Sequence, residues 1–176
     1  MIYLDQVKLS DSILNDINKF LNYFNLNHID IIITDVNKKE YYWKQNNYFK
    51  SKPFPGNKVF RAWSIPTERK SIIFQDRAET ELSIFWLIIH EITHVKLQTE
   101  WFLLFTVINI ERNILLKELN YSMNDYLDKG MRDDNFRNSE PEEILCDRVA
   151  NAIIGEVLDR NWWKNRINNI DNIIIS

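Results

Sequence analysis

The stretch LIIHEITHVKL, residues 87–97, decides how the rest of the sequence is interpreted. It is apolar at most positions, yet it contains His90, Glu91 and His94. A helix that is apolar on nearly every side is buried, and burying these three polar side chains without partners would cost several kcal/mol. The H-E-x-x-H spacing places both histidines one turn apart on one helix face, where they can bind one tetrahedral ion. The stretch therefore predicts a buried helix that carries two metal ligands.

The composition is that of an ordinary globular chain. Its 176 residues, 45% of them hydrophobic, predict one domain over residues 1–176 with a well-buried core. A net charge of -3 gives no reason to expect nucleic acid or an anionic membrane as the main partner. The single cysteine, Cys146, excludes an intramolecular disulfide framework and fits a reducing compartment. With no signal peptide at the start, and with its richest apolar run, 101–110, too short to span a bilayer, we expect a cytoplasmic protein.

The first part of the chain predicts one helix and a small sheet. Apolar residues at helical spacing behind a Ser/Asp start signal predict a helix over 10–25. The β-branched run 29–35 predicts a strand buried on both faces, and 58–66 and 69–76 predict two strands joined by a turn that contains proline. The segment 41–57 is aromatic and then rich in Pro, Gly and Asn, which predicts a strand end followed by an irregular loop.

The second part is predicted to be helical. We expect helices over 79–98, 101–120 and 139–158, with a polar loop containing a helical turn over 123–140. Together these elements predict an α+β fold, in which a small mixed or antiparallel sheet with an N-terminal helix precedes a helical half that carries the metal-site helices.

The start of the last helix carries clear signals. Ser139 and Glu142 have the spacing of a capping box. Pro141 falls in the first turn, where its missing N–H costs nothing.

A catalytic zinc ion needs a third protein ligand and one open position. The remaining histidine, His28, lies far upstream, which favours a carboxylate. The last helix places two acids on a stripe with apolar residues, and an amphipathic helix should not bury acids without a reason; the stripe is Glu143, Asp147, Ala150 and Ile154. Glu143 is the candidate third ligand, and Asp147 could accept the free N–H of a ligating histidine. Glu142 or Glu140 could be the ligand instead.

Other side chains near these motifs have candidate roles. Glu91 leans to the side of the histidine pair and could act as general base towards a water on the metal. Cys146 is a small buried filler or a thiol that contacts the site. Tyr121 and Tyr126 are both candidates to stabilise an oxyanion, and the sequence does not choose between them.

The two motifs together resemble the gluzincin metallopeptidases, in which H-E-x-x-H is followed downstream by a helix bearing E-x-x-x-D. The segment EILCDRVANAII, residues 143–154, is similar to the E-x-x-A-(D/N)-x-(F/L)-A signature of that group. The order of strands, HEITH helix and glutamate helix over roughly 58–158 resembles the soluble ImmA/IrrE-like peptidases. Thr93 and Cys146 stand where those peptidases usually have glycine and alanine.

The resemblance implies a single zincin-like domain that holds Zn²⁺ through His90, His94 and Glu143. It also implies that Glu91 is the general base and that Asp147 supports a ligating histidine. The implied activity is that of a zinc-dependent endopeptidase that cleaves a specific intracellular protein, such as a repressor or another host factor.

Two alternatives remain open from the sequence. One is a catalytically idle zincin-like module that recognises a protein partner without cutting it. The other is a helical interaction domain without metal. The oligomeric state is not predicted.

Overall fold

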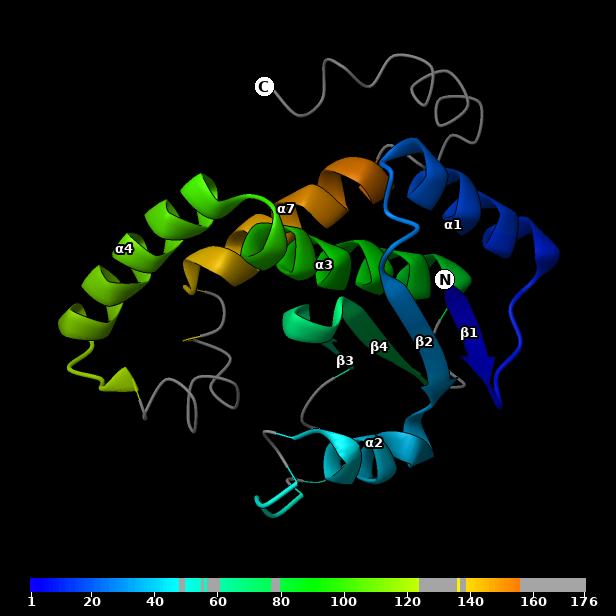
Figure 1. The fold of residues 1–176 in the computed structure, drawn as a ribbon, viewed down its shortest axis with the longest axis horizontal. Coiled ribbons are helices and arrows are strands. Elements are labelled where there is room, and N and C mark those ends of the chain that lie inside the picture. The colour runs from blue at the N-terminus through cyan, green and yellow to red at the C-terminus, as the bar shows by residue number, and fades with distance from the viewer. Residues whose placement is uncertain are drawn as a thin grey trace.

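A computed structural model describes residues 1–47, 50–54, 56, 61–76, 80–123, 136 and 139–155 (Figure 1). The described strands are β1 Ile2–Asp5, β2 Asp30–Asp35, β3 Ala62–Ile65 and β4 Lys70–Gln75. The described helices are α1 Asp11–Tyr23, α2 Lys39–Gln45, α3 Glu81–Thr99, α4 Phe102–Glu118 and α7 Pro141–Gly155. The fold is α+β, with an N-terminal strand and helix and with helices in the latter half, so the predicted fold class is confirmed.

The four strands form one mixed sheet in the order β1-β2-β4-β3. β1, β2 and β4 run parallel, and β3 is antiparallel to β4. The turn between β3 and β4 is the short 3-10 helix Pro66–Glu68, as the proline there predicted.

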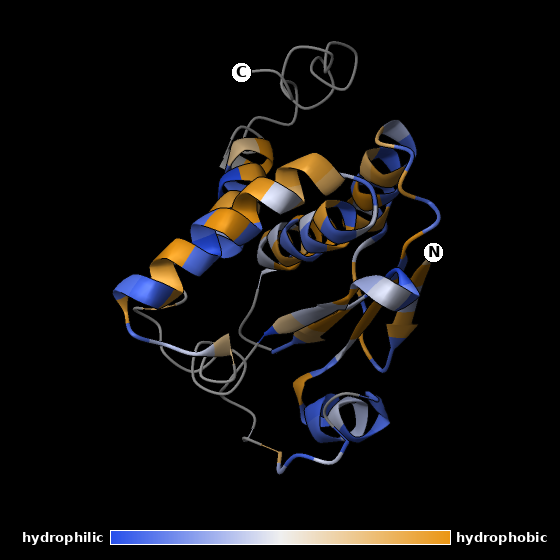
Figure 2. Ribbon diagram, turned by 60° about the vertical axis from the view of Figure 1, so that its left-hand side comes forward, coloured by the Kyte–Doolittle hydropathy of each residue, from blue (hydrophilic) through white to orange (hydrophobic). Residues whose placement is uncertain are grey.

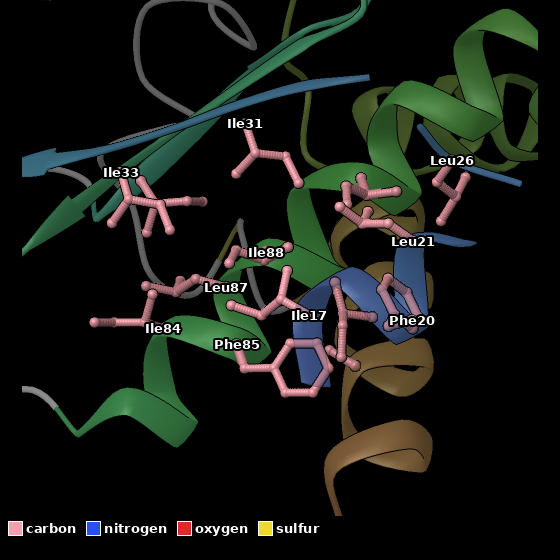
Figure 3. Close-up of a cluster of buried hydrophobic side chains, with 14 of the residues drawn as sticks. Ile17, Phe20, Leu21, Leu26, Ile31, Ile33, Ile84, Phe85, Leu87 and Ile88 are labelled. Carbon is pink, nitrogen blue, oxygen red and sulfur yellow. The ribbon is translucent and has the colours of Figure 1, made fainter. Parts of the chain in front are cut away.

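Both faces of the sheet are covered. Successive side chains of a strand point to opposite faces, so each strand contributes side chains to both layers. Ile31 and Ile33 of β2 and Ile73 of β4 pack into the large core shared with α1 and α3 (Figure 3). On the other face, Ile32 of β2 is partly buried against the cluster that contains Ile72 and Phe74 of β4, and Thr34 of β2 is fully buried. The prediction that the strand near 29–35 is buried on both faces is therefore confirmed.

The helix α1 begins behind the predicted Ser/Asp signal, with Ser10 as its N-cap, and α3 begins two residues later than predicted, with Thr80 as its N-cap. The Ser10 hydroxyl accepts a hydrogen bond from the Ile13 N–H at 3.4 Å. Thr80 accepts one from the Ser83 N–H at 3.1 Å. The Glu81 carboxylate accepts hydrogen bonds from both the N–H and the hydroxyl of Ser10, at 2.5 and 2.6 Å. These two bonds link the start of α1 to the start of α3.

Two local predictions were wrong or incomplete. The segment after residue 41 was predicted to be a strand end, but it belongs to the helix α2. Trp43 of α2 packs with Trp63 and Phe74 on the sheet face opposite α3, and Glu40 pairs with Lys44 at 2.6 Å along the helix. β1 was not predicted at all, since its four residues form a strand only by pairing with β2.

α4 extends away from the sheet and packs against α3 and α7 with one side only. Its buried residues are Ile108, Arg112 and Leu116. Hydrophobic residues recur along its ribbon (Figure 2). Large apolar side chains are exposed along the rest of the helix: Phe102, Leu103, Leu104, Val107, Ile110 and Ile114. Within the described residues, no helix is long and apolar enough to cross a membrane.

Five predicted elements extend into undescribed residues. The loop 123–140 lies almost wholly outside the described part of the chain. Outside it too are residues 58–60 of a predicted strand, residues 79 and 156–158 at the ends of two predicted helices, and residues 48, 49, 55 and 57 of the segment 41–57.

The Phe85→Ala variant should be strongly destabilised. Phe85 is 0% exposed and its ring meets that of Phe20 edge-on at 5.8 Å, so truncation leaves a cavity between α1 and α3 that costs about 3–5 kcal/mol. Urea unfolding followed by circular dichroism measures the loss. The control Leu103→Ala, at a residue that is 88% exposed, should change the unfolding free energy by less than about 0.5 kcal/mol. Equal effects of the two changes would contradict this core.

Candidate metal centre

The centre lies between α3 and α7, which run antiparallel with one-turn steps in register. Trp86 Nε1 donates to Asn151 Oδ1 at 2.9 Å. One turn along α3, His90 meets Asp147, which lies one turn back along α7. A turn further, His94 faces Glu142 and Glu143. Side chains four residues apart lie on the same helix face. The face of α3 and the face of α7 that carry these residues therefore meet along one line of contacts, called the seam here.

The two histidines present their Nε2 atoms to one common point. These atoms are 3.1 Å apart. The Glu143 carboxylate faces both of them, with Oε2 3.3 Å from Nε2 of His90 and Oε1 3.5 Å from Nε2 of His94. Two nitrogens held by one tetrahedral zinc at about 2.0–2.1 Å would be separated by roughly 3.3 Å. The spacing of these donors therefore fits a metal ion.

The other ring nitrogen of each histidine faces a carboxylate. His94 Nδ1 is 2.8 Å from Glu142 Oε1. His90 Nδ1 is 2.9 Å from Asp147 Oδ1, in poorer alignment than a regular hydrogen bond. Because a carboxylate only accepts, Glu142 and Asp147 favour the neutral tautomers that carry the proton on Nδ1 and turn an Nε2 lone pair to the centre. Two lone pairs and the Glu143 carboxylate then converge, and only a cation or added protons can stabilise that arrangement.

Cys146 completes a buried group of possible ligands. His90, His94 and Cys146 each offer a ligand atom, and these atoms all lie within 4.8 Å of one another. All three residues are buried. This group could hold a metal ion, as the prediction of a metal site requires.

An ion network on the far side of His94 fixes Glu142. Gln98 Nε2 donates to Glu142 Oε1 at 2.8 Å, and the Arg112 guanidinium of α4 donates to Glu142 Oε2. Arg112 Nε also donates to Glu140 Oε1 at 2.6 Å. Each buried charge in this network has a partner of opposite charge, which makes its burial tolerable. Because Arg112 belongs to α4 and Glu142 contacts His94, the network also links α4 to the histidine seam.

The predicted capping box at the start of α7 is wrong. The Ser139 N–H donates to the Phe136 carbonyl at 3.0 Å, not to Glu142. The Glu143 N–H is capped instead by Glu140 Oε2 at 2.8 Å. The Glu142 carboxylate does not cap the helix, because it binds His94 and Arg112 instead. The two alternatives to Glu143 as ligand, Glu140 and Glu142, are therefore both engaged away from the Nε2 atoms.

The surroundings shift the protonation of these groups. Burial by itself lowers the pKa of His90, but Asp147 and Glu143 outweigh it and raise that pKa. The pKa of His94 is raised well above its usual value in the same way, against burial, by Cys146, Glu142 and Glu143. In Glu142, burial opposes ionisation, yet bonds from His94, Gln98 and Arg112 lower the pKa to about 2. Burial raises the pKa of the Cys146 thiol to about 11, although His94 opposes that shift.

Glu91 is also buried. It follows His90 directly on α3, and its negative charge is close enough to favour protonation of that ring. The predicted base therefore lies beside the histidine pair.

The described residues among the other sequence candidates have partners of their own. The third histidine, His28, is paired with Glu100 at 2.8 Å. The Tyr121 ring packs against Phe136 at 5.8 Å, and Tyr126 lies outside the described residues.

Sequence reasoning missed three members of the centre. Arg112 and Gln98 give no local signal, because their partner Glu142 is distant in the chain. Trp86, whose ring stacks on His90 at 5.2 Å and 28°, could have been found one turn before His90 on the same face.

Comparison of the chain with protein-family models, with curated proteins and with solved structures finds no match.

Asp147→Asn should weaken metal binding by roughly 10–100-fold, because a neutral amide is a weaker acceptor than the carboxylate for the Nδ1 proton of His90 and can also turn its NH₂ group to the ring. The neighbouring change Arg148→Gln, at an exposed position of the same helix, should leave affinity unchanged. Competition with a chromogenic zinc chelator measures both affinities. Equal affinity in Asp147→Asn and wild type would exclude this role for Asp147.

The metal-free protein should lose stability as pH rises above about 6.5. The pKa of both centre histidines is raised by folding, so their contribution is fully present below the unfolded pKa and is lost as pH rises through the folded values. Zinc replaces these protons, so the increase in Tm caused by zinc should grow over the same range. Scanning calorimetry from pH 6 to pH 9, with His28→Gln as control, measures both trends. A flat metal-free profile in wild type would contradict the assignment.

Proposed function

We propose that the chain is a zinc-dependent endopeptidase of gluzincin type, with zinc held by His90, His94 and Glu143. The observation that carries the proposal is the convergence of two histidine Nε2 atoms and one carboxylate on a single point, with the Nδ1 atoms backed by Asp147 and Glu142. The resemblance of HEITH and EILCDRVANAII to gluzincin motifs supports the same ligands.

The donor set favours zinc over other common ions. Calcium and magnesium bind through oxygen atoms, whereas this centre offers two imidazole nitrogens, a carboxylate and a nearby thiol. Nitrogen and sulfur donors in a tetrahedral arrangement are typical of zinc sites.

Zinc bound here supplies a Lewis acid that polarises a peptide carbonyl and makes a water molecule more acidic. Glu91 accepts the proton of the attacking water and passes it to the leaving amine. Asp147 and Glu142 keep both histidines in the tautomer that turns Nε2 to the centre. Arg112 keeps Glu142 ionised in its buried position.

The proposed substrate is a specific intracellular protein. A chain of 176 residues has little room for a deep cleft with many subsites, which favours one target over general digestion. The resemblance to ImmA/IrrE-like peptidases suggests a repressor or another host factor as that target.

Glu91→Gln should retain stoichiometric zinc and lose at least about 100-fold in kcat, because the amide cannot accept a proton. The assay is cleavage of a quenched fluorescent peptide library, with metal content measured by mass spectrometry on the same samples. Glu111→Gln, the same change at an exposed position of α4, serves as control and should cleave like wild type.

Undiminished cleavage by Glu91→Gln would exclude the proposed base. A wild-type protein that binds zinc but cleaves neither the library nor any protein of its host would favour the idle binding module instead.

A further inference from the structure

Cys146 lies beside the centre without a part in the proposed reaction. It follows Glu142 by one turn of α7, is 0% exposed and packs against Leu97 and Ile108. Its sulfur lies within 4.8 Å of a ring nitrogen of His90 and of one of His94. It is the only cysteine of the chain.

A small apolar side chain would fill this place without a chemical consequence, but a thiol adds a strong zinc ligand. Together with a ring nitrogen each from His90 and His94, and with the Glu143 carboxylate, Cys146 brings the number of possible donors at the centre to four. Four protein ligands close a tetrahedral zinc site, whereas a catalytic site keeps one position open. The chain therefore has the ligands for two states of one centre, a closed state with four protein ligands and an open state with three.

The closed state requires little movement. A sulfur and a nitrogen bound to one tetrahedral zinc are separated by roughly 3.6 Å, so from its limit of 4.8 Å the thiol must approach by at most about 1.2 Å. Rotation about the first side-chain torsion of cysteine covers such a distance.

We propose that Cys146 is the fourth ligand of the resting centre, so that the protein is latent until the sulfur leaves the metal. The inference rests on the proposed function, since it concerns the same zinc ion. On closing, the sulfur–zinc bond forms and the thiol proton passes to solvent. On opening, that bond breaks and the sulfur takes up a proton from solvent, which frees the fourth position for substrate.

Cobalt substitution of the full chain tests the bond itself. A thiolate bound to Co²⁺ gives a near-ultraviolet charge-transfer band, and because the chain has one cysteine, that band reports Cys146. We expect the band in wild type and in Glu143→Gln, and its loss in Cys146→Ala with one cobalt still bound per chain. Cys146→Ser replaces the alanine variant if the cavity left by alanine prevents folding.

Binding of acetohydroxamate to the cobalt protein tests whether the fourth position is closed. This small ligand must displace the sulfur in wild type but meets an open position in Cys146→Ala, so we expect at least about tenfold tighter binding to the variant. The cobalt visible spectrum follows the titration, and no peptide substrate is needed.

The possible failures are distinct. Stoichiometric cobalt without the charge-transfer band, and equal acetohydroxamate affinity in wild type and variant, would overturn the closed state and leave the proposed function standing. Absence of bound metal in wild type after reconstitution would overturn both.

Discussion

The structure depends on one constraint: two histidine nitrogens and a carboxylate, from segments that are distant in the sequence, lie together at one point between α3 and α7. Nε2 of His90 and Nε2 of His94 lie 3.1 Å apart and face Glu143, while their Nδ1 atoms face carboxylates. Such a seam is stable only with a positive charge at its centre. In the absence of metal, protons on the histidines supply this positive charge, in agreement with the raised pKa values of both rings. A divalent ion supplies it more completely.

The surrounding fold makes that convergence rigid. α3 is buried by the sheet on one side and by α1 and α7 on the other (Figure 1). Arg112 adds a third helix, since it neutralises both Glu140 and Glu142 from α4. Several groups therefore bind the Glu142 carboxylate that faces His94. Because removal of one partner from a buried ion network leaves an unpaired charge, each of these groups helps to fix that carboxylate in place.

Local patterns in the sequence predicted most of the fold and the core of the site. The spacing of His90 and His94, and of Glu143 and Asp147, is a property of single helices, and these residues meet as expected. What failed depends on contacts between distant segments. Glu142 was assigned to a capping box because its partners His94 and Arg112 are not neighbours in sequence. The aromatic residues near Trp43 suggested a strand, but their burial against the sheet favours a helix there.

A crystal structure of the protein purified without added metal, with diffraction recorded on both sides of the zinc absorption edge, tests the central claim most directly. The account predicts one anomalous difference peak, bonded to Nε2 of His90, Nε2 of His94 and a carboxylate oxygen of Glu143. A zinc-reconstituted crystal without such a peak, in which these side chains keep their present positions, would contradict it.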